Sequence, residues 1–249
     1  MGKLIHFEFR KLFQQKSFYI CNMVILLFVF LSIIMSKIIY EQTAEGIDIP
    51  TTMDFIKTAL TSGNVILIVS IWIALFTCED YNEGTIKNSY ARGYSRTQVY
   101  LSKWMVVSTA SVITCLVCWI GTYGIGSIFF EMGNVHLFNW ISVLLCQLLG
   151  LLCYTSLFFT ISIFFKKTGG AIAGCIISPM IFSILFTTIN SLLSQEKFNL
   201  NDYWLESLMG DLTSPLVSNQ TMFVACGLMG LYMIVFVGIG LMINRKQEL

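Results

Sequence analysis

Six long apolar segments constrain this chain more than any other feature of its sequence. Each has at least about 20 residues, the number that a helix needs to cross roughly 30 Å of hydrocarbon. The alternating pattern of barrel strands is missing. The sequence therefore predicts an all-α integral membrane protein that forms one transmembrane domain over residues 1–249. Its six transmembrane helices are expected at residues 18–39, 58–78, 104–130, 140–165, 171–193 and 222–243.

The composition excludes a soluble protein of the same length. Only 12% of the residues are charged and 56% are apolar, whereas soluble domains carry roughly 25% charged residues. A net charge of +1 provides no electrostatic footprint for nucleic acid. We therefore expect the lipid bilayer to surround this chain, and we expect no nucleic-acid partner.

The basic residues predict how the chain is oriented in the membrane. Twelve of the fifteen Lys and Arg residues lie on one side of the predicted spans. Because basic loops stay in the cytoplasm, both termini are expected there. The twelve are Lys3, Arg10, Lys11, Lys16, Lys87, Arg92, Arg96, Lys103, Lys166, Lys167, Arg245 and Lys246.

The predicted spans lack the groups that ion-driven transport and catalysis use. Their central parts contain no Asp, Glu, Lys, Arg or His, which excludes a voltage sensor and leaves a proton-coupled transporter without its usual relay. The only Gly-Lys dipeptide is Gly2-Lys3, so the chain has no phosphate-binding loop of an ATPase. We expect no catalytic residue, no metal site and no cofactor bound by this chain.

The eight cysteines all lie within the predicted spans or at their ends. Because none lies in an outside loop, the sequence argues against a disulfide scaffold. Cys115 and Cys118 have the spacing of a redox motif, but they lie in the middle of a span. We expect the cysteines to be small apolar fillers of the helix core.

Mildly polar side chains inside the spans allow two interpretations. They can form hydrogen bonds between helices, each stabilising by about 0.6 kcal/mol, or they can line a weakly polar path for an amphipathic cargo. The candidates for such a path are Asn22, Gln147, Tyr154, Thr187 and Asn190.

Residues 1–17 predict an amphipathic helix that lies on the membrane surface. Ile5, Phe9, Leu12 and Phe13 recur at helical spacing, and Arg10 is on the other face. Such a helix lies in the headgroup plane with its basic residues toward anionic lipid. The alternative is a basic flank that only fixes the topology.

Residues 79–103, between the second and third predicted spans, contain signals for a short helix and a sharp turn. Thr85 can cap the start of the helix and Gly93 can end it. Ser95 and Gln98 form a capping box that opens the third span. We expect a rigid helix-turn-helix elbow, hereafter the elbow, whose mixed charges suit docking of another protein; a passive loop is the alternative.

Several runs in this part of the chain can be compared with known families: Glu83-Gly84-Thr85-Ile86-Lys87-Asn88, Gly93-Tyr94-Ser95-Arg96, Tyr100-Leu101-Ser102-Lys103 and, upstream, Glu8-Phe9-Arg10-Lys11-Leu12. Together they resemble the ABC-2 family of ABC transporter permeases. In that family the loop between spans two and three is a coupling helix that docks into a groove of a separate ATPase subunit.

The resemblance implies this ATPase-coupling role for Glu83, Gly84, Thr85, Lys87, Asn88, Gly93, Ser95 and Arg96. The connection between the fourth and fifth spans, Lys166-Lys167-Thr168, is very short. We therefore expect any second contact with the ATPase to be small.

Residues 194–220 lie on the outside, before the last span. Trp204, Leu205, Leu208, Met209 and Leu212 share one helical face, and Asp202 can cap the start of the helix. An amphipathic helix with Trp at the interface suits a lid over an exit path. A structural anchor at the interface is the other interpretation.

The resemblance implies one half of an ATP-driven exporter in the cytoplasmic membrane of a bacterium. Two six-span permease subunits, identical or related, would pair above two copies of an ABC ATPase, which would bind ATP and Mg²⁺. The small relatives in this family imply an amphipathic peptide or drug as cargo. Two alternatives stay open: an ATP-independent channel or carrier, and a non-transporting accessory or sensory subunit.

Overall fold

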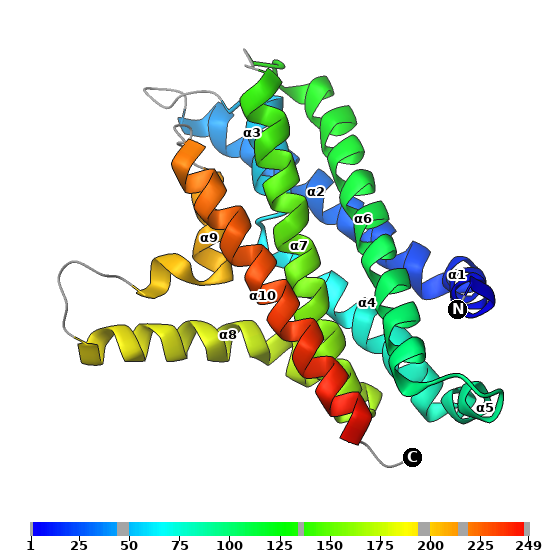
Figure 1. Ribbon diagram of the computed structural model, residues 1–249. Helices are drawn as coiled ribbons and strands as arrows, with labels where there is room; N and C mark the ends of the chain where they lie inside the picture. Colours follow the sequence, from blue (N-terminus) through cyan, green and yellow to red (C-terminus); the bar gives the residue numbers. More distant parts are fainter. Residues whose placement is uncertain (1, 44–49, 134–136, 194–199, 214–218, 247–249) are drawn as a thin grey trace.

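The apolar segments form long helices in the computed structural model, which describes residues 2–43, 50–133, 137–193, 200–213 and 219–246 (Figure 1). All regular structure in these ranges is helical. The elements are α1 (Gly2–Gln14), α2 (Lys16–Thr43), α3 (Thr52–Ala59), α4 (Gly63–Asn82), α5 (Thr85–Ala91), α6 (Arg96–Phe129), α7 (Leu137–Phe165), α8 (Thr168–Leu193), the 3-10 helix η1 (Leu200–Tyr203), α9 (Leu205–Asp211) and α10 (Asn219–Lys246).

Six segments of the described residues are long and apolar enough to cross a membrane, which confirms the predicted number of spans. They are Lys16–Gln42, Thr52–Asn82, Arg96–Phe129, Trp140–Phe165, Thr168–Leu192 and Gln220–Arg245. The second and third spans extend further toward α5 than hydropathy predicts, because their polar ends are helical as well. We call the end that carries α1, α5 and the last turn of α10 the cytoplasmic end, following the charge prediction (Figure 1).

The second span is interrupted near its outer end, which hydropathy alone did not indicate. A capping box between Thr51 and Asp54 starts α3, and the chain then breaks between Ala59 and Gly63 before α4 begins. The Thr52 amide donates to the Glu131 carbonyl at 3.0 Å. This bond ties the outer half of the interrupted span to the end of α6.

Helix α7 lies in the middle of the bundle, and α10 lies beside it (Figure 1). The Thr160 hydroxyl donates to the Phe236 carbonyl at 2.9 Å, and Tyr100 of α6 donates to the Val237 carbonyl at 3.2 Å. Buried hydroxyls of this kind satisfy backbone groups across helices where no water is present. They join α6, α7 and α10 in the half of the bundle nearer the cytoplasmic end.

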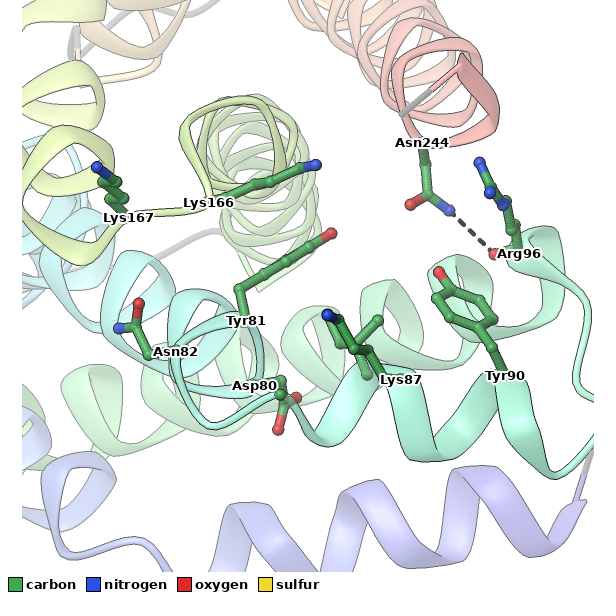
Figure 2. Close-up of a pocket in the computed structure, with 11 residues that line it drawn as sticks. Asp80, Tyr81, Asn82, Lys87, Tyr90, Arg96, Lys166, Lys167 and Asn244 are labelled. Atoms are coloured by element: carbon green, nitrogen blue, oxygen red, sulfur yellow. Dashed lines mark hydrogen bonds between the residues drawn. The ribbon is translucent and has the colours of Figure 1, made fainter. Parts of the chain in front are cut away.

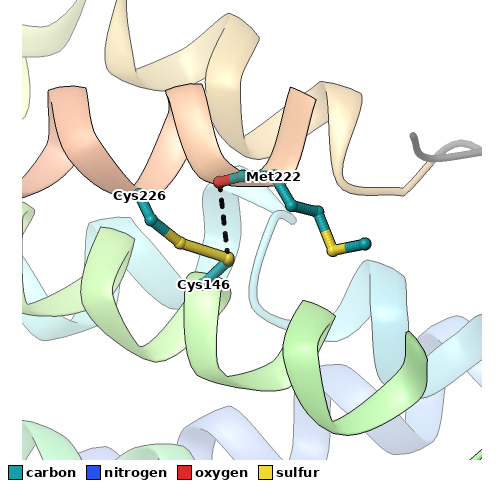
Figure 3. Close-up of a disulfide and its surroundings, with 3 residues drawn as sticks. All are labelled: Cys146, Met222 and Cys226. Atoms are coloured by element: carbon teal, nitrogen blue, oxygen red, sulfur yellow. Dashed lines mark hydrogen bonds between the residues drawn. A yellow bond between two sulfur atoms is a disulfide. The ribbon is translucent and has the colours of Figure 1, made fainter. Parts of the chain in front are cut away.

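A disulfide joins α7 to α10 in the outer half of the bundle (Figure 3). Cys146 and Cys226 have their Cα atoms 5.7 Å apart, and the Cys146 sulfur lies 3.9 Å from the Met222 carbonyl oxygen. The expectation that all cysteines are core fillers is therefore wrong for this pair. The two lie far apart in sequence and inside spans, so no loop signal marked them; the other six are free.

Helix α8 leaves the other long helices at a wide angle, and η1 and α9 lie between α8 and α10 (Figure 1). At its cytoplasmic end α8 approaches α7 closely: a Cβ added at Gly174 would lie 2.6 Å from the Phe165 ring and 3.0 Å from Ile161. The small residues of α8 thus serve packing within this chain. Farther along, Met180, Ile184 and Leu192 are exposed.

Trp204 fills the space between α8 and α10. Its indole stacks on Phe182 and Phe186 of α8, with ring centroids 5.0 and 5.2 Å apart, and meets Tyr232 of α10 edge-on. Trp204 occupies the N-cap position of α9. The expected cap at Asp202 is therefore wrong, because residues 200–203 form a separate 3-10 turn.

Candidate functional site

The elbow at the cytoplasmic end is formed by α5 and the turns that flank it. Gly84 precedes α5 with φ +69°, and Gly93 follows it with φ +86°. Both values lie in the left-handed region, where a Cβ is unfavourable and glycine is not. A Cβ would meet no atom within 4 Å at either position, so the requirement for glycine comes from the backbone alone.

Thr85 does not cap α5 as expected. Gly84 occupies the N-cap position, and the Thr85 hydroxyl instead donates to the Asp80 carboxylate at 2.8 Å. The capping box of α6 is confirmed. The backbone N–H of Gln98 donates to Ser95 Oγ at 3.3 Å, and the backbone N–H of Ser95 donates to Gln98 Oε1 at 3.0 Å. The Thr85 prediction failed because a buried carboxylate competes for the hydroxyl.

Asp80, in the last turn of α4, is the centre of an ionic cluster in which Glu8, Asp80 and Lys103 are buried. Its carboxylate accepts from Lys11 of α1 at 2.5 Å and from Lys103 of α6. Lys11 also lies 2.9 Å from Glu79. We call Glu8, Lys11, Glu79, Asp80 and Lys103 the Asp80 cluster.

Glu8 completes the cluster from α1. Its carboxylate lies 3.3 Å from the Lys103 ammonium, and the two side chains are 3% and 6% exposed. The second carboxylate oxygen of Glu8 is buried without a hydrogen-bond partner among the described residues. Because unpaired charges are costly in such surroundings, Glu8 depends on Lys103.

The cluster adds a contact that the prediction for α1 did not include. The helix is present and buries Leu4, Glu8 and Leu12 against the bundle, whereas Phe13 of the predicted apolar face is half exposed; contact of that face with the membrane surface stays a prediction. Apolar spacing missed Glu8 because a carboxylate scores as a surface residue. The sequence did contain a signal for this cluster. Acidic and basic residues occur on α1 and at the ends of the second and third spans, and helices that pack in one bundle place such charges close together.

A cavity of about 310 Å³ lies between α5, the α7–α8 turn and the last turn of α10 (Figure 2). We call it the basic pocket, since Lys87, Arg96, Lys166 and Lys167 line it. Asp80, the one carboxylate among its described lining residues, is turned toward the lysines of the Asp80 cluster. The remaining lining residues are Tyr81, Asn82, Gly84, Ile86, Tyr90 and Asn244.

The turn between α7 and α8 brings two lysines to the pocket. Lys166 has φ +57°, an unusual value for a residue with a side chain, and this reverses the chain within two residues. Asn82 at the end of α4 donates to Thr168 at 2.7 Å, which holds α8 against α4. Lys87 and Lys166 extend toward the same space in Figure 2.

The opposite wall of the pocket joins α6 to α10. Asn244 donates to the Arg96 carbonyl at 3.0 Å, and the Arg96 guanidinium donates to the Arg245 carbonyl at 3.1 Å. Burial raises the pKa of the Tyr90 phenol, and Arg96 and Asn244 oppose that shift. Tyr90 therefore stays a neutral hydrogen-bonding group in a positively charged pocket.

The structure divides the predicted coupling residues between two faces of α5. Gly84, Lys87 and Arg96 line the basic pocket. Thr85 and Asn88 line a second cavity, of about 260 Å³, between α5 and α1. Ile86 is buried and fixes α5 to the bundle. The other predicted residues, Glu83, Gly93 and Ser95, are exposed.

The predicted cargo-path residues lie on three different helices. Gln147 is fully buried and donates to the Lys57 carbonyl of α3 at 2.5 Å, while Asn22 donates to the Phe18 carbonyl of its own helix. Thr187 is exposed and bonds its own helix, and Asn190 lies farther along α8. Tyr154 is buried beside a cavity described below. Their role in transport stays a prediction.

The predicted lid residues are all buried. Trp204, Leu205, Leu208 and Met209 have exposed fractions of 4% or less, and α9 contacts α7 and α10. The amphipathic face packs within the chain. Whether it also acts as a lid stays a prediction.

Comparison with known proteins gives two matches. A family model described as ABC-2 family transporter protein matches residues 4–190. The chain is also 25% identical over 215 residues to the uncharacterized protein YhcI of Bacillus subtilis (strain 168). That match covers 77% of this chain and 66% of the relative, slightly less than two thirds of its length.

Proposed function

Because this chain belongs to the ABC-2 family of transporter proteins, we propose that its elbow couples an ABC ATPase to movement of the spans. The family and the six apolar helices make it a multi-pass protein of the cytoplasmic membrane, and we propose that its ATP is bound by a separate ABC ATPase subunit. The proposal goes further in three respects: direction, cargo and assembly. We propose an exporter of amphipathic peptides or drugs.

The observation that carries the proposal is the basic pocket beside α5. Four cationic side chains from three parts of the chain converge there, and the nearest carboxylate is neutralised by lysines. Such a surface complements acidic side chains of a docking protein. Because Lys166 and Lys167 line the same pocket as Lys87, the α7–α8 turn would add to the proposed contact made by α5.

The Asp80 cluster supports transmission of force from the elbow. Asp80 binds α5 through Thr85, α1 through Lys11 and α6 through Lys103. A displacement of α5 by the ATPase would therefore move α1, α4 and α6 together. ATP and Mg²⁺ would be held by the ATPase, and this chain would contribute motion rather than chemistry.

The proposed assembly contains two permease subunits, identical or related, and two ATPase subunits. The exposed apolar side chains of α8, among them Met180 and Ile184, provide area for lipid or for a second permease subunit. An ATP-independent carrier, in contrast, gives the basic pocket no task.

Charge reversal in the basic pocket tests the coupling. We expect Lys87→Glu with Arg96→Glu to abolish co-purification with the ATPase from the native cell, because both cations face the proposed contact. Membrane insertion should be unchanged, since both lie outside the hydrocarbon. The matched control is Arg10→Glu with Lys16→Glu, two exposed cations on the same side of the protein that line neither cavity beside α5. Retention of the ATPase by the pocket variant at the control level would contradict the proposal.

A further inference from the structure

A third cavity, of about 240 Å³, lies between α4, α7, α8 and α9. It is separate from the basic pocket and shares none of its residues. Its walls are mostly apolar, and Ile66, Leu67, Phe158 and Met180 contribute to them. One carboxylate, Glu206 of α9, also lines it.

The position of Glu206 is defined by its neighbours. The cavity includes Tyr154 and Pro179, which lie in the middle parts of α7 and α8. Sequence analysis assigned Glu206 to an outside loop, since it lies between the last two spans. The structure places this acidic group on the same cavity lining as Tyr154 and Pro179, a neighbourhood that its position in the sequence did not indicate.

The apolar face of α9 explains why the helix enters the bundle. Leu205, Leu208 and Met209 are buried, and the Met209 side chain packs where Gly150 of α7 leaves room for it. Glu206 lies off this stripe. The packing of α9 against α7 therefore holds Glu206 on the lining of the cavity.

The structure shows no cation from the described part of the chain paired with the Glu206 carboxylate. Glu206 is nevertheless exposed, so the carboxylate is accessible from the cavity. An ionised carboxylate beside apolar walls is unfavourable unless a positive group pairs with it.

We propose that this cavity binds an ammonium group carried on an apolar chain, with Glu206 as its counter-ion. The apolar walls would take the chain, and the Tyr154 and Ser70 hydroxyls lie on the same lining. The volume is below the roughly 300–1,000 Å³ of sites for drug-sized ligands. The site therefore suits an alkylammonium or the lysine side chain of an amphipathic peptide.

This inference deepens the proposed function, because it assigns a cationic amphipath as the cargo class. The ammonium of phosphatidylethanolamine has the same chemistry and is the other source of such a ligand. The position of the cavity beside the middle parts of α7 and α8 favours the cargo, since lipid headgroups lie at the membrane surface.

The test uses the full chain in nanodiscs of phosphatidylcholine and phosphatidylglycerol, without ATPase. The probe is n-decylammonium with a diazirine on its chain. The uncharged control probe is the corresponding alcohol with the same diazirine. We expect saturable labelling by the ammonium, mapped by mass spectrometry to cavity-lining peptides of α4 and α8. Excess unlabelled n-decylammonium should block it, and excess n-decanol should not.

Glu206→Gln should lower labelling by the ammonium at least fivefold and leave labelling by the alcohol unchanged, while Glu206→Lys should abolish it. The matched control is Asp211→Asn, which removes one carboxylate from the same short helix but does not line the cavity. Unchanged labelling of Glu206→Gln would overturn the proposal. The wild-type competition tests it independently of any variant: equal protection by decanol would also overturn it.

Addition of phosphatidylethanolamine separates the two sources of ammonium. Labelling that persists in its presence supports a cargo site, whereas loss of labelling identifies a lipid as the occupant and overturns the cargo assignment. If ammonium labelling fails but the ATPase co-purifies normally, only the proposal of an ammonium site is refuted. If labelling is normal but ATPase binding does not depend on Lys87 and Arg96, only the proposed coupling through the basic pocket is refuted.

Discussion

Removal of the Lys103 ammonium should destabilise this protein more than loss of any exposed lysine. The Asp80 cluster contains three carboxylates and two ammonium groups, so its net charge is −1. Lys103→Met preserves the approximate length of the side chain and changes that net charge to −2. Two buried carboxylates, Glu8 and Asp80, then lose the cation that they share.

The magnitude follows from the burial of the partners. The side chains of Lys103, Glu8 and Asp80 are 6%, 3% and 6% exposed, so solvent screens them little. Removing one partner of a buried ion pair costs about 3–5 kcal/mol, because the other charge stays uncompensated. Asp80 keeps Lys11, whereas Glu8 keeps no cation among the described residues, so most of the loss should come from Glu8.

A double-mutant cycle isolates this contribution. If Glu8 causes the loss, Glu8→Gln combined with Lys103→Met should recover about 2 kcal/mol relative to Lys103→Met alone, within the coupling range of contacting residues. Lys16→Met is the matched control, since Lys16 is exposed; its effect should stay within about 0.5 kcal/mol.

Unfolding in mild detergent can be followed with a maleimide fluorophore that labels free cysteines when they become accessible. Cys78 is free, buried and two residues from Asp80, so it reports opening at the cluster. A loss for Lys103→Met no larger than that of Lys16→Met would refute the assignment of a buried, shared cation. So would strict additivity of the two substitutions.

Three further predictions concern other parts of the chain. Gly93→Ala should lower stability by about 1–2 kcal/mol, because φ is +86° there, and Gly93→Asn should cost less; thermal unfolding of both variants checks this. Replacing Cys146 and Cys226 by Ser should cost about 2–4 kcal/mol, measured against the non-reduced protein. Burial and, to a smaller extent, the nearby Asp202 carboxylate raise the pKa of Asp211. Ionisation of Asp211 therefore destabilises the folded protein as pH rises. The Tm of Asp211→Asn relative to the wild type should increase above about pH 4.

The number of spans could be predicted from the sequence because each depends on local apolar length. The elbow could be predicted for a similar reason: Gly93 and the Ser95 capping box act within a few residues of themselves. These signals need no knowledge of which helices become neighbours.

The ionic and covalent contacts could not be predicted in this way. The partners in the Asp80 cluster come from α1, α4 and α6, and hydropathy placed Asp80 and Lys103 in a loop. The sequence placed Glu206 between the last two spans but could not show that it lies on the same cavity as Tyr154 of α7 and Pro179 of α8. In each case the deciding interaction joins segments far apart in sequence.

The disulfide between α7 and α10 has a consequence for biogenesis. Its two cysteines are 80 residues apart, and Cys226 belongs to the last helix of the bundle. The bond can close only after α10 has entered the membrane and packed against α7. The fraction of oxidised Cys146 in newly made chains therefore measures how many of them have completed insertion, and a pulse-chase with thiol alkylation would time that step.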